Sequence, residues 1–429
     1  MVLLATIDNL RSWRYRVHAL PGRTRSGTKI GGAFPNVHEN RFIGSLTGLR
    51  YVAAVTVVVG HGSLAMRHDW LADLVAQISS IGMTLFFVLS GFVLWLNYAA
   101  SFGSKPVPEA LREFAVARFA RLYPMYAVVV LGIAAWMVAW KGIEPRSLAF
   151  VLTMTQAWFP VLGGKMLVAV MPSIEHLWSI SVELFFYLLF PIVCILLGRV
   201  RGLATVMLVA LGNLVLFAIA IFVFFQFGKK FLQAVVPSLT DNGMQWLTYY
   251  SPYLHISQFL AGCFVAMVYL KLATRPVGRT EGRAVLILFW LSVAGLAVMP
   301  VALFFQPELP AYYFCIELTV RLAEVACFSV ILLAASRYRL ARFLSFRAMI
   351  IGGECSYSIY LLHPFLIRIA MIGKSEAPGV PEFVLRLCLF VAVVTAVAWV
   401  TYSVIEAPSR TWLRRVLGTS APREVLRTT

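Results

Sequence analysis

The chain has 429 residues, of which 60% are hydrophobic and 13% are charged, and its formal net charge is +18. A soluble chain carries about 25% charged residues, so the composition indicates an integral membrane protein. The basic residues do not indicate nucleic-acid binding, which needs them gathered on one soluble face, because they lie between apolar runs. The six cysteines lie in or beside those runs without a CxxC pair, and predict neither a disulfide framework nor a metal site.

Residues 1–43 are polar and basic, and we expect a disordered cytoplasmic tail without a secretory signal. Apolar runs long enough to cross a bilayer as helices follow. About ten spans are expected, with approximate limits 44–66, 76–98, 119–140, 177–198, 203–226, 252–271, 284–306, 313–335, 347–372 and 383–406. The predicted fold is therefore an all-α, polytopic membrane bundle.

The link at 141–176 contains apolar patches that prolines and a Gly-Gly pair interrupt. A re-entrant or interfacial segment there would raise the count to eleven. With the N-terminus inside, most lysines and arginines fall on the inner side, which predicts cytoplasmic termini and an even number of spans. The expected domains are the tail at 1–43, a membrane domain at 44–408 and a basic cytoplasmic tail at 409–429.

The stretch TGLRYVAAVTVVVGHG places Arg50 and His61 in the first span. Eleven positions on one helix separate them by about 16 Å along its axis and about 20° around it. They are expected to share one face, with Arg50 near the cytoplasmic end and His61 toward the outer end. The stripe would line a channel; the alternative is a snorkelling arginine and a histidine satisfied by a neighbouring helix.

The motif HLWSISVELFFYLLFP, from His176 to Pro191, places Glu183 about two turns into the fourth span. Counted from the outer side, Glu183 and His61 lie at similar depth. A carboxylate beside an imidazole orients it and stabilises its charged form. The pair predicts a general base, His61, with Glu183 as its partner; the alternative is a structural ion pair between helices.

The motif RFARLYPMY places Arg118 and Arg121 three residues apart, on one helix face. Two guanidinium groups side by side suit a phosphate. By itself, however, this pattern is more typical of a basic anchor at the cytoplasmic end of a span.

In GECSYSIYLLHPF, Ser356, Tyr360 and His363 form one polar stripe at i, i+4 and i+7. Pro364 lacks an N–H and leaves the carbonyl of Tyr360 free. His363 is expected to shape the acyl path or a substrate site, or to satisfy helix packing.

Glu317, Arg321 and Glu324 repeat the i, i+4, i+7 spacing in the eighth span. They suit pairing within the helix or an acceptor site. In the second span, GMTLFFVLSGF offers small residues for close helix packing.

Together these stretches resemble the membrane acyltransferase-3 family. The resemblance runs from Phe42 to about Arg410. Its motifs stand in the family's order: the Arg-ten-His stretch, LFFVLSGF, RFARLYP, WSISVELFFY, FLAGC, SYSIYLLHP and IEAP with Glu406. Members move acyl groups, mostly acetyl, from cytoplasmic acyl-CoA to acceptors such as surface sugars. In the family, the first motif's arginine and histidine and the fourth motif's glutamate are functional, which carries over to Arg50, His61 and Glu183.

With this resemblance, Arg50, Arg118 and Arg121 are expected to hold the CoA phosphates at the cytoplasmic mouth. His61 would take the proton of an acceptor hydroxyl, and Ser179, Ser181 or Tyr187 would donate to the oxyanion. The substrate-contacting or supporting residues expected are Trp178, Ser179, Ser181, Tyr187, Ser356, Tyr360, His363, Glu317 and Arg321.

Two departures from the family pattern are visible. His255 and Gln258 stand before FLAGC, where many relatives have an arginine. Some relatives also carry an extracytoplasmic hydrolase-like domain; the printed sequence stops soon after its last span, and we therefore expect a second transfer step to need another protein.

The resulting prediction is a multi-pass O-acyltransferase of a bacterial inner membrane, with acetyl-CoA as donor, a glycan as acceptor and no metal. Membrane lipid and polysaccharide-assembly proteins are the expected partners, and nucleic acid is not. Alternatives are a small-molecule or lipid-linked acceptor, a non-catalytic scaffold, or a secondary transporter. A transporter would use the same buried ionisable residues, but the repeated halves typical of transporters are missing.

Overall fold

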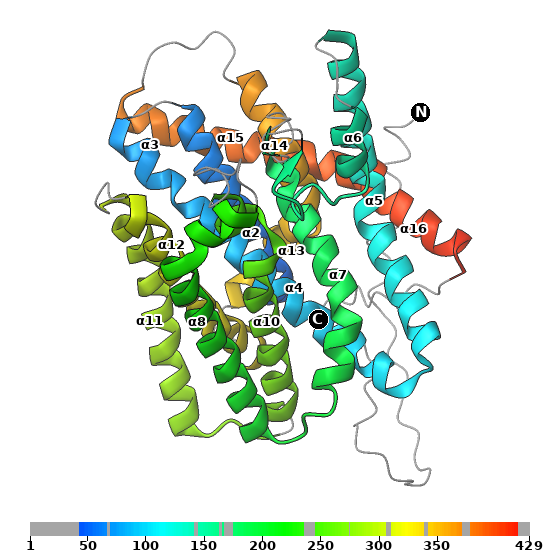
Figure 1. Ribbon diagram of the computed structural model, residues 1–429, viewed down its shortest axis with the longest axis vertical. Coiled ribbons are helices and arrows are strands. Elements are labelled where there is room, and N and C mark those ends of the chain that lie inside the picture. Colours follow the sequence, from blue (N-terminus) through cyan, green and yellow to red (C-terminus); the bar gives the residue numbers. More distant parts are fainter. Residues whose placement is uncertain are drawn as a thin grey trace. The chain divides into compact units, whose positions relative to one another are not determined.

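A computed structural model describes residues 43–66, 69–140, 145–162, 165–166, 175–235, 245–273, 275–305, 310–338, 342–370 and 378–418. This part of the chain is almost entirely helical, which confirms the predicted all-α class (Figure 1). Two short strands, β1 (Val161–Leu162) and β2 (Lys165–Met166), pair in an antiparallel ribbon. The expected tail at 1–43 lies outside the described residues, apart from Ile43.

The α-helices are α2 (Gly44–Ala65), α3 (Asp69–Ala76), α4 (Ile78–Ser104), α5 (Val107–Trp140), α6 (Pro145–Leu152), α7 (Trp178–Leu197), α8 (Leu203–Val235), α10 (Pro252–Leu272), α11 (Arg279–Phe304), α12 (Pro310–Arg337), α13 (Arg347–Glu354), α14 (Ser356–Ala370), α15 (Val380–Thr401) and α16 (Ala407–Val416). Short 3₁₀ or π turns are η1 (Glu175–Leu177), η2 (Trp246–Tyr250), η3 (Arg342–Ser345) and η4 (Tyr402–Glu406).

Within the described residues, nine helical segments are long and apolar enough to cross a membrane. They correspond to nine of the ten expected spans. The expected span at 347–372 is instead two helices, α13 and α14, which meet at Cys355. Gly352 and Gly353 precede the break, and glycine weakens a helix interior. In the link at 141–176, α6 and the β1–β2 ribbon are described, whereas residues 167–174 are not.

Helices α4 and α10 pack closely in the middle of the bundle. Gly91 of α4 faces the backbone of Phe259, and Gly262 of α10 faces the backbone of Val88. No side chain fits between the helices at these points, since even a Cβ atom would overlap backbone atoms. The small residues of LFFVLSGF and FLAGC therefore serve helix packing, as predicted for the first of these motifs.

Helix α4 connects two groups of neighbouring helices. On one side α10 and α12 contact α4, and α8 and α11 pack beside them (Figure 1). On the other side α2 contacts α4, and α13, α14 and α15 pack against α2. Helix α7 contacts both α4 and α5, and α16 packs against α5. The residues of the predicted site thus come from helices distant in the sequence.

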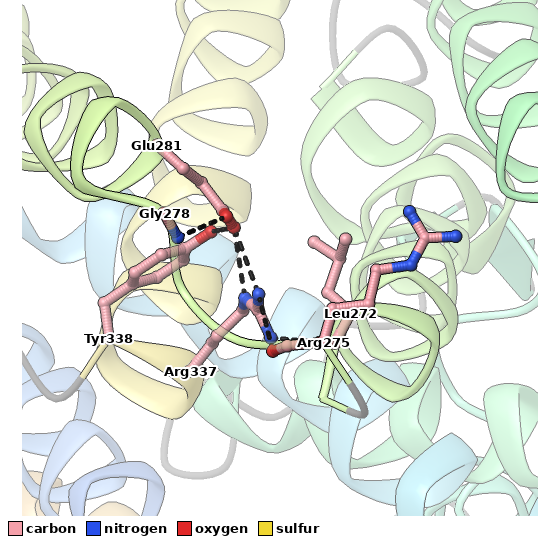
Figure 2. A network of polar contacts seen from close by, with 6 residues as sticks. All are labelled: Leu272, Arg275, Gly278, Glu281, Arg337 and Tyr338. Carbon is pink, nitrogen blue, oxygen red and sulfur yellow. Dashed lines mark hydrogen bonds and ion pairs between the residues drawn. The ribbon is translucent and has the colours of Figure 1, made fainter.

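One polar network joins the ends of α10, α11 and α12 (Figure 2). The Arg337 guanidinium donates to the carboxylate of Glu281, at 3.2 and 3.3 Å, and to the backbone carbonyls of Leu272 and Arg275. The Tyr338 hydroxyl also donates to Glu281. The contacts tie down the connection between α10 and α11, so this arginine has a structural role.

Candidate active site

A cavity of about 70 Å³, with both apolar and charged side chains in its lining, lies among α2, α4, α5, α7 and α14. A volume of this size holds several water molecules. Three arginines line it: Arg50 from α2, and Arg118 and Arg121 from α5. One carboxylate, that of Glu183, lines it as well. The formal charge of these four side chains is positive, which favours an anionic ligand.

Arg118 is held by two tyrosines. Its Nη2 donates to the Tyr98 hydroxyl at 2.6 Å, and its guanidinium carbon lies 4.8 Å from the Tyr98 ring centre and 5.7 Å from that of Tyr187. Its Nε is buried and has no hydrogen-bond partner within the described part of the chain. A buried donor without a partner costs free energy, unless water or a ligand binds it.

Glu183 lies in the cavity at the arginine end. The Tyr187 hydroxyl, one turn further along α7, donates to its carboxylate. Tyr187 also lines the cavity. This carboxylate therefore offsets part of the positive charge of the arginines.

A cluster of three histidines forms a second polar group. His61 Nδ1 lies 2.9 Å from His363 Nε2, and the two rings stack with centres 5.2 Å apart and planes 24° apart. His363 Nδ1 lies 2.7 Å from the carbonyl oxygen of Tyr360. The ring of His176 in η1 lies 5.7 Å from that of His363. No group of residues suited to a metal ion is found in the described ranges.

Tyr360 joins the cavity to the histidines. It lines the cavity together with Ser179, whose hydroxyl donates to the Tyr360 oxygen at 2.6 Å. The Tyr360 hydroxyl in turn donates to the backbone carbonyl of His176. Because Tyr360 also accepts from His363 through its own carbonyl, one residue of α14 contacts both polar groups.

The cavity brings together eight of the residues predicted from sequence: Arg50, Arg118, Arg121, Ser179, Glu183, Tyr187, Ser356 and Tyr360. The predicted contact between Glu183 and His61 is absent from the described hydrogen bonds and ion pairs: Glu183 pairs with Tyr187, and His61 with His363. Similar depth was the basis of that prediction. Depth does not fix which way a helix is turned about its axis, and the residue of this motif nearest the histidine pair is His176.

Three other predicted residues, Trp178, Ser181 and Arg321, are not among the residues that line the cavity. Trp178 packs 5.4 Å from the ring of His255 and 5.1 Å from that of Tyr249. Ser181 accepts from the backbone N–H of Ala157 at 3.2 Å. Arg321 donates to the backbone carbonyl of Thr248. The side chain of Glu317 is outside the described residues.

Two of the predicted oxyanion donors have other acceptors. The hydroxyls of Ser179 and Tyr187 donate to Tyr360 and Glu183. They would have to reorient before they could stabilise an oxyanion.

Glu324 and Gln258 belong to a separate buried network. The Glu324 carboxylate accepts from Thr84 at 2.5 Å and from Ser80 at 3.4 Å, both on α4. Gln258 contacts Thr84 at 3.4 Å and His255 at 2.9 Å. The two residues noted before FLAGC thus connect α10 to α4 and, through Thr84, to α12.

Sequence reasoning missed His176 and Tyr357 as site residues. His176 is buried, and its Nε2 has no hydrogen-bond partner in the described ranges. Tyr357 lines the cavity and donates to the carbonyl of Leu122 at 2.9 Å. Both lie within motifs that were recognised. The available signal was a polar side chain within each motif.

The motif IEAP has a structural function. Its Glu406 is buried and accepts from the Ser358 hydroxyl at 2.6 Å. The contact holds η4, at the end of α15, against α14, which carries Tyr360 and His363.

The fold defines a multi-pass helical membrane protein, with a cavity lined by three arginines between its helices. A family model described as an acyltransferase domain, of the acyltransferase-3 type, matches residues 43–403. The chain belongs to this family, as the motifs predicted.

Curated relatives are similar over most of the chain. The peptidoglycan O-acetyltransferase OatA of Listeria monocytogenes is 24% identical over 388 residues, which cover 87% of this chain and 56% of the relative. The O-acetyltransferase OatA of Staphylococcus aureus is 22% identical over 393 residues, which cover 89% and 60%. The chain therefore spans little more than half the length of these relatives. No solved structure matches it.

Proposed function

We propose that this protein is a membrane O-acyltransferase that moves an acetyl group from cytoplasmic acetyl-CoA to a hydroxyl of an extracytoplasmic glycan. Membership of the acyltransferase family supports the reaction class. The name of the Listeria relative, a peptidoglycan O-acetyltransferase, favours a cell-wall glycan as acceptor. The proposed setting is a bacterial cytoplasmic membrane, with glycan-assembly proteins as partners.

One observation carries the proposal: Arg50, Arg118 and Arg121 line one cavity within the helical bundle. Guanidinium groups bind phosphates through charge-assisted, often paired, hydrogen bonds. The donor's phosphates would occupy this end of the cavity. The buried Nε of Arg118 there has no hydrogen-bond partner among the described residues. The pantetheine arm would then extend along α2 toward His61, about 16 Å further along the helix.

The transfer itself needs a base at the far end of the arm. The acceptor oxygen attacks the thioester carbonyl carbon while its proton passes to His61. The C–S bond then breaks, and the CoA thiolate leaves and takes that proton back from His61. Atoms and charges balance without a metal or a redox partner. Glu183 balances the arginine charge, and Tyr360 separates the phosphate end from the histidines.

The proposal is tested with purified protein in lipid and radiolabelled acetyl-CoA. Release of CoA is followed with and without a cell-envelope glycan fraction, in wild type, His61→Ala and Arg50→Ala. Arg112→Ala is the matched control, because Arg112 is an exposed arginine of α5 outside the cavity lining.

We expect glycan-dependent release in wild type and in the control. His61→Ala should abolish release while donor binding persists, and Arg50→Ala should raise the KM for acetyl-CoA at least about tenfold, the equivalent of one charged hydrogen bond. A wild-type protein that neither releases CoA nor binds it would contradict the proposal and would favour a transporter.

A further inference from the structure

The pairing of His61 with His363 determines where the imidazole protons lie. A backbone carbonyl oxygen only accepts hydrogen bonds. Because His363 Nδ1 lies 2.7 Å from the carbonyl oxygen of Tyr360, this nitrogen carries a proton. His363 is fully buried, and no carboxylate is among its described contacts, so a charged ring there would be costly. The ring is therefore neutral, and its Nε2 is an acceptor.

The same logic continues to His61. Its Nδ1 lies 2.9 Å from His363 Nε2, which has a lone pair to offer, so His61 Nδ1 supplies the hydrogen. A neutral His61 then has no proton on Nε2. We propose that His363 is a positioning residue that fixes His61 in the tautomer whose Nε2 is free to act as base. This inference rests on the proposed function for the identity of the base.

This arrangement gives the base an orienting partner without a carboxylate. In a Ser-His-Asp triad, a carboxylate accepts from Nδ1–H, sets the tautomer and stabilises the imidazolium. Here the neutral His363 accepts instead, and its own orientation is set by the backbone of α14. When His61 takes a proton at Nε2, the Nδ1–H bond to His363 becomes a charge-assisted hydrogen bond and strengthens.

Nitrogen-15 spectra of histidine-labelled protein in lipid bilayers test the tautomer without any substrate. His61 is assigned by the signals lost in His61→Gln. We expect wild-type His61 to show a protonated Nδ1 and a bare Nε2, and His363→Ala to shift it toward the opposite tautomer. His363→Gln should keep the wild-type pattern, because its amide oxygen can accept from Nδ1–H. A wild-type His61 protonated at Nε2 would overturn the inference, whether or not the protein transfers acyl groups.

Kinetics give a second readout. Loss of the tautomer should lower kcat of His363→Ala by about 10²- to 10⁴-fold, the usual contribution of a general base, with the KM for acetyl-CoA within about twofold. His363→Gln should recover most of kcat. An equal loss in both variants, with unchanged spectra, would make His363 a packing residue only. If His61 shows the expected tautomer but the protein transfers acetyl to no glycan, the result would instead contradict the proposed function.

Discussion

Gly262→Ala places one methyl group between α4 and α10, where the structure leaves no space. The added Cβ would lie 2.8 Å from the backbone nitrogen of Phe92 and from the carbonyl carbon of Val88, and nearer still to the Val88 oxygen. Comfortable contacts are about 3.5–4.0 Å, so the helices must move apart by more than about 1 Å. Overpacking of this kind costs about 1–3 kcal/mol.

A matched control separates this cost from helix propensity. Gly212 of α8 has no atom within 4 Å of an added Cβ. Gly212→Ala should therefore gain only the propensity of alanine over glycine, about 0.5–1 kcal/mol. The same gain applies to Gly262→Ala, so the difference between the two variants measures the overpacking alone.

The assay is thermal unfolding in detergent, followed by a dye that fluoresces on reaction with thiols. Cys263 lies beside the substituted position and is buried with Cys194 and Cys355, so these thiols react only as the bundle opens. We expect Gly262→Ala to unfold at least about 2 °C below Gly212→Ala, from about 2–4 °C per kcal/mol in mid-sized domains. An unfolding midpoint equal to or above that of the control would refute the close crossing of α4 and α10.

Three other substitutions test the site and its support. Arg118→Lys should raise the KM for acetyl-CoA about tenfold, because lysine lacks the planar fork that binds phosphate in pairs; an unchanged KM in the CoA-release assay would contradict a donor role. Ser358→Ala leaves the buried Glu406 carboxylate without its described donor and should cost about 1–3 kcal/mol in thermal unfolding; the exposed Ser403→Ala is the control, and equal midpoints would refute the contact. Tyr187→Phe removes the hydroxyl that donates to the Glu183 carboxylate and should also lower the free energy of unfolding by about 1–3 kcal/mol; an unfolding midpoint at the wild-type value would show that water replaces this hydroxyl.

The sequence predicted the helices well because each apolar run that crosses lipid must satisfy its backbone N–H and C=O groups within its own helix. That requirement is local, so length and hydropathy identified nine spans directly. The break at Cys355 was missed because the run at 347–372 is long enough to cross a bilayer, and hydropathy does not register that Gly353 lies against the backbone of Thr47 in α2. The orientation of the termini stays a prediction.

The site was predicted in part. Motif chemistry together with the family resemblance selected arginines 50, 118 and 121 and Glu183, and the structure brings them into one cavity. The hydrogen-bond partner of His61 was not predicted from the sequence. Helix period gave the face of α2 on which His61 lies, but the rotation of α7 and α14 about their own axes depends on packing between helices. Tertiary structure therefore placed Glu183 with Tyr187 and His363 with His61.

What the sequence by itself determined is the membrane class, the family motifs and the ionisable residues that lipid would not tolerate without a function. Only the tertiary structure decided which of those residues touch. Hydrogen-bond partners are chosen over distances of about 3 Å, whereas helix depth is defined only to within a turn, about 5.4 Å. For this reason the sequence named His61 as the candidate base, and the folded chain was needed to find His363 beside it.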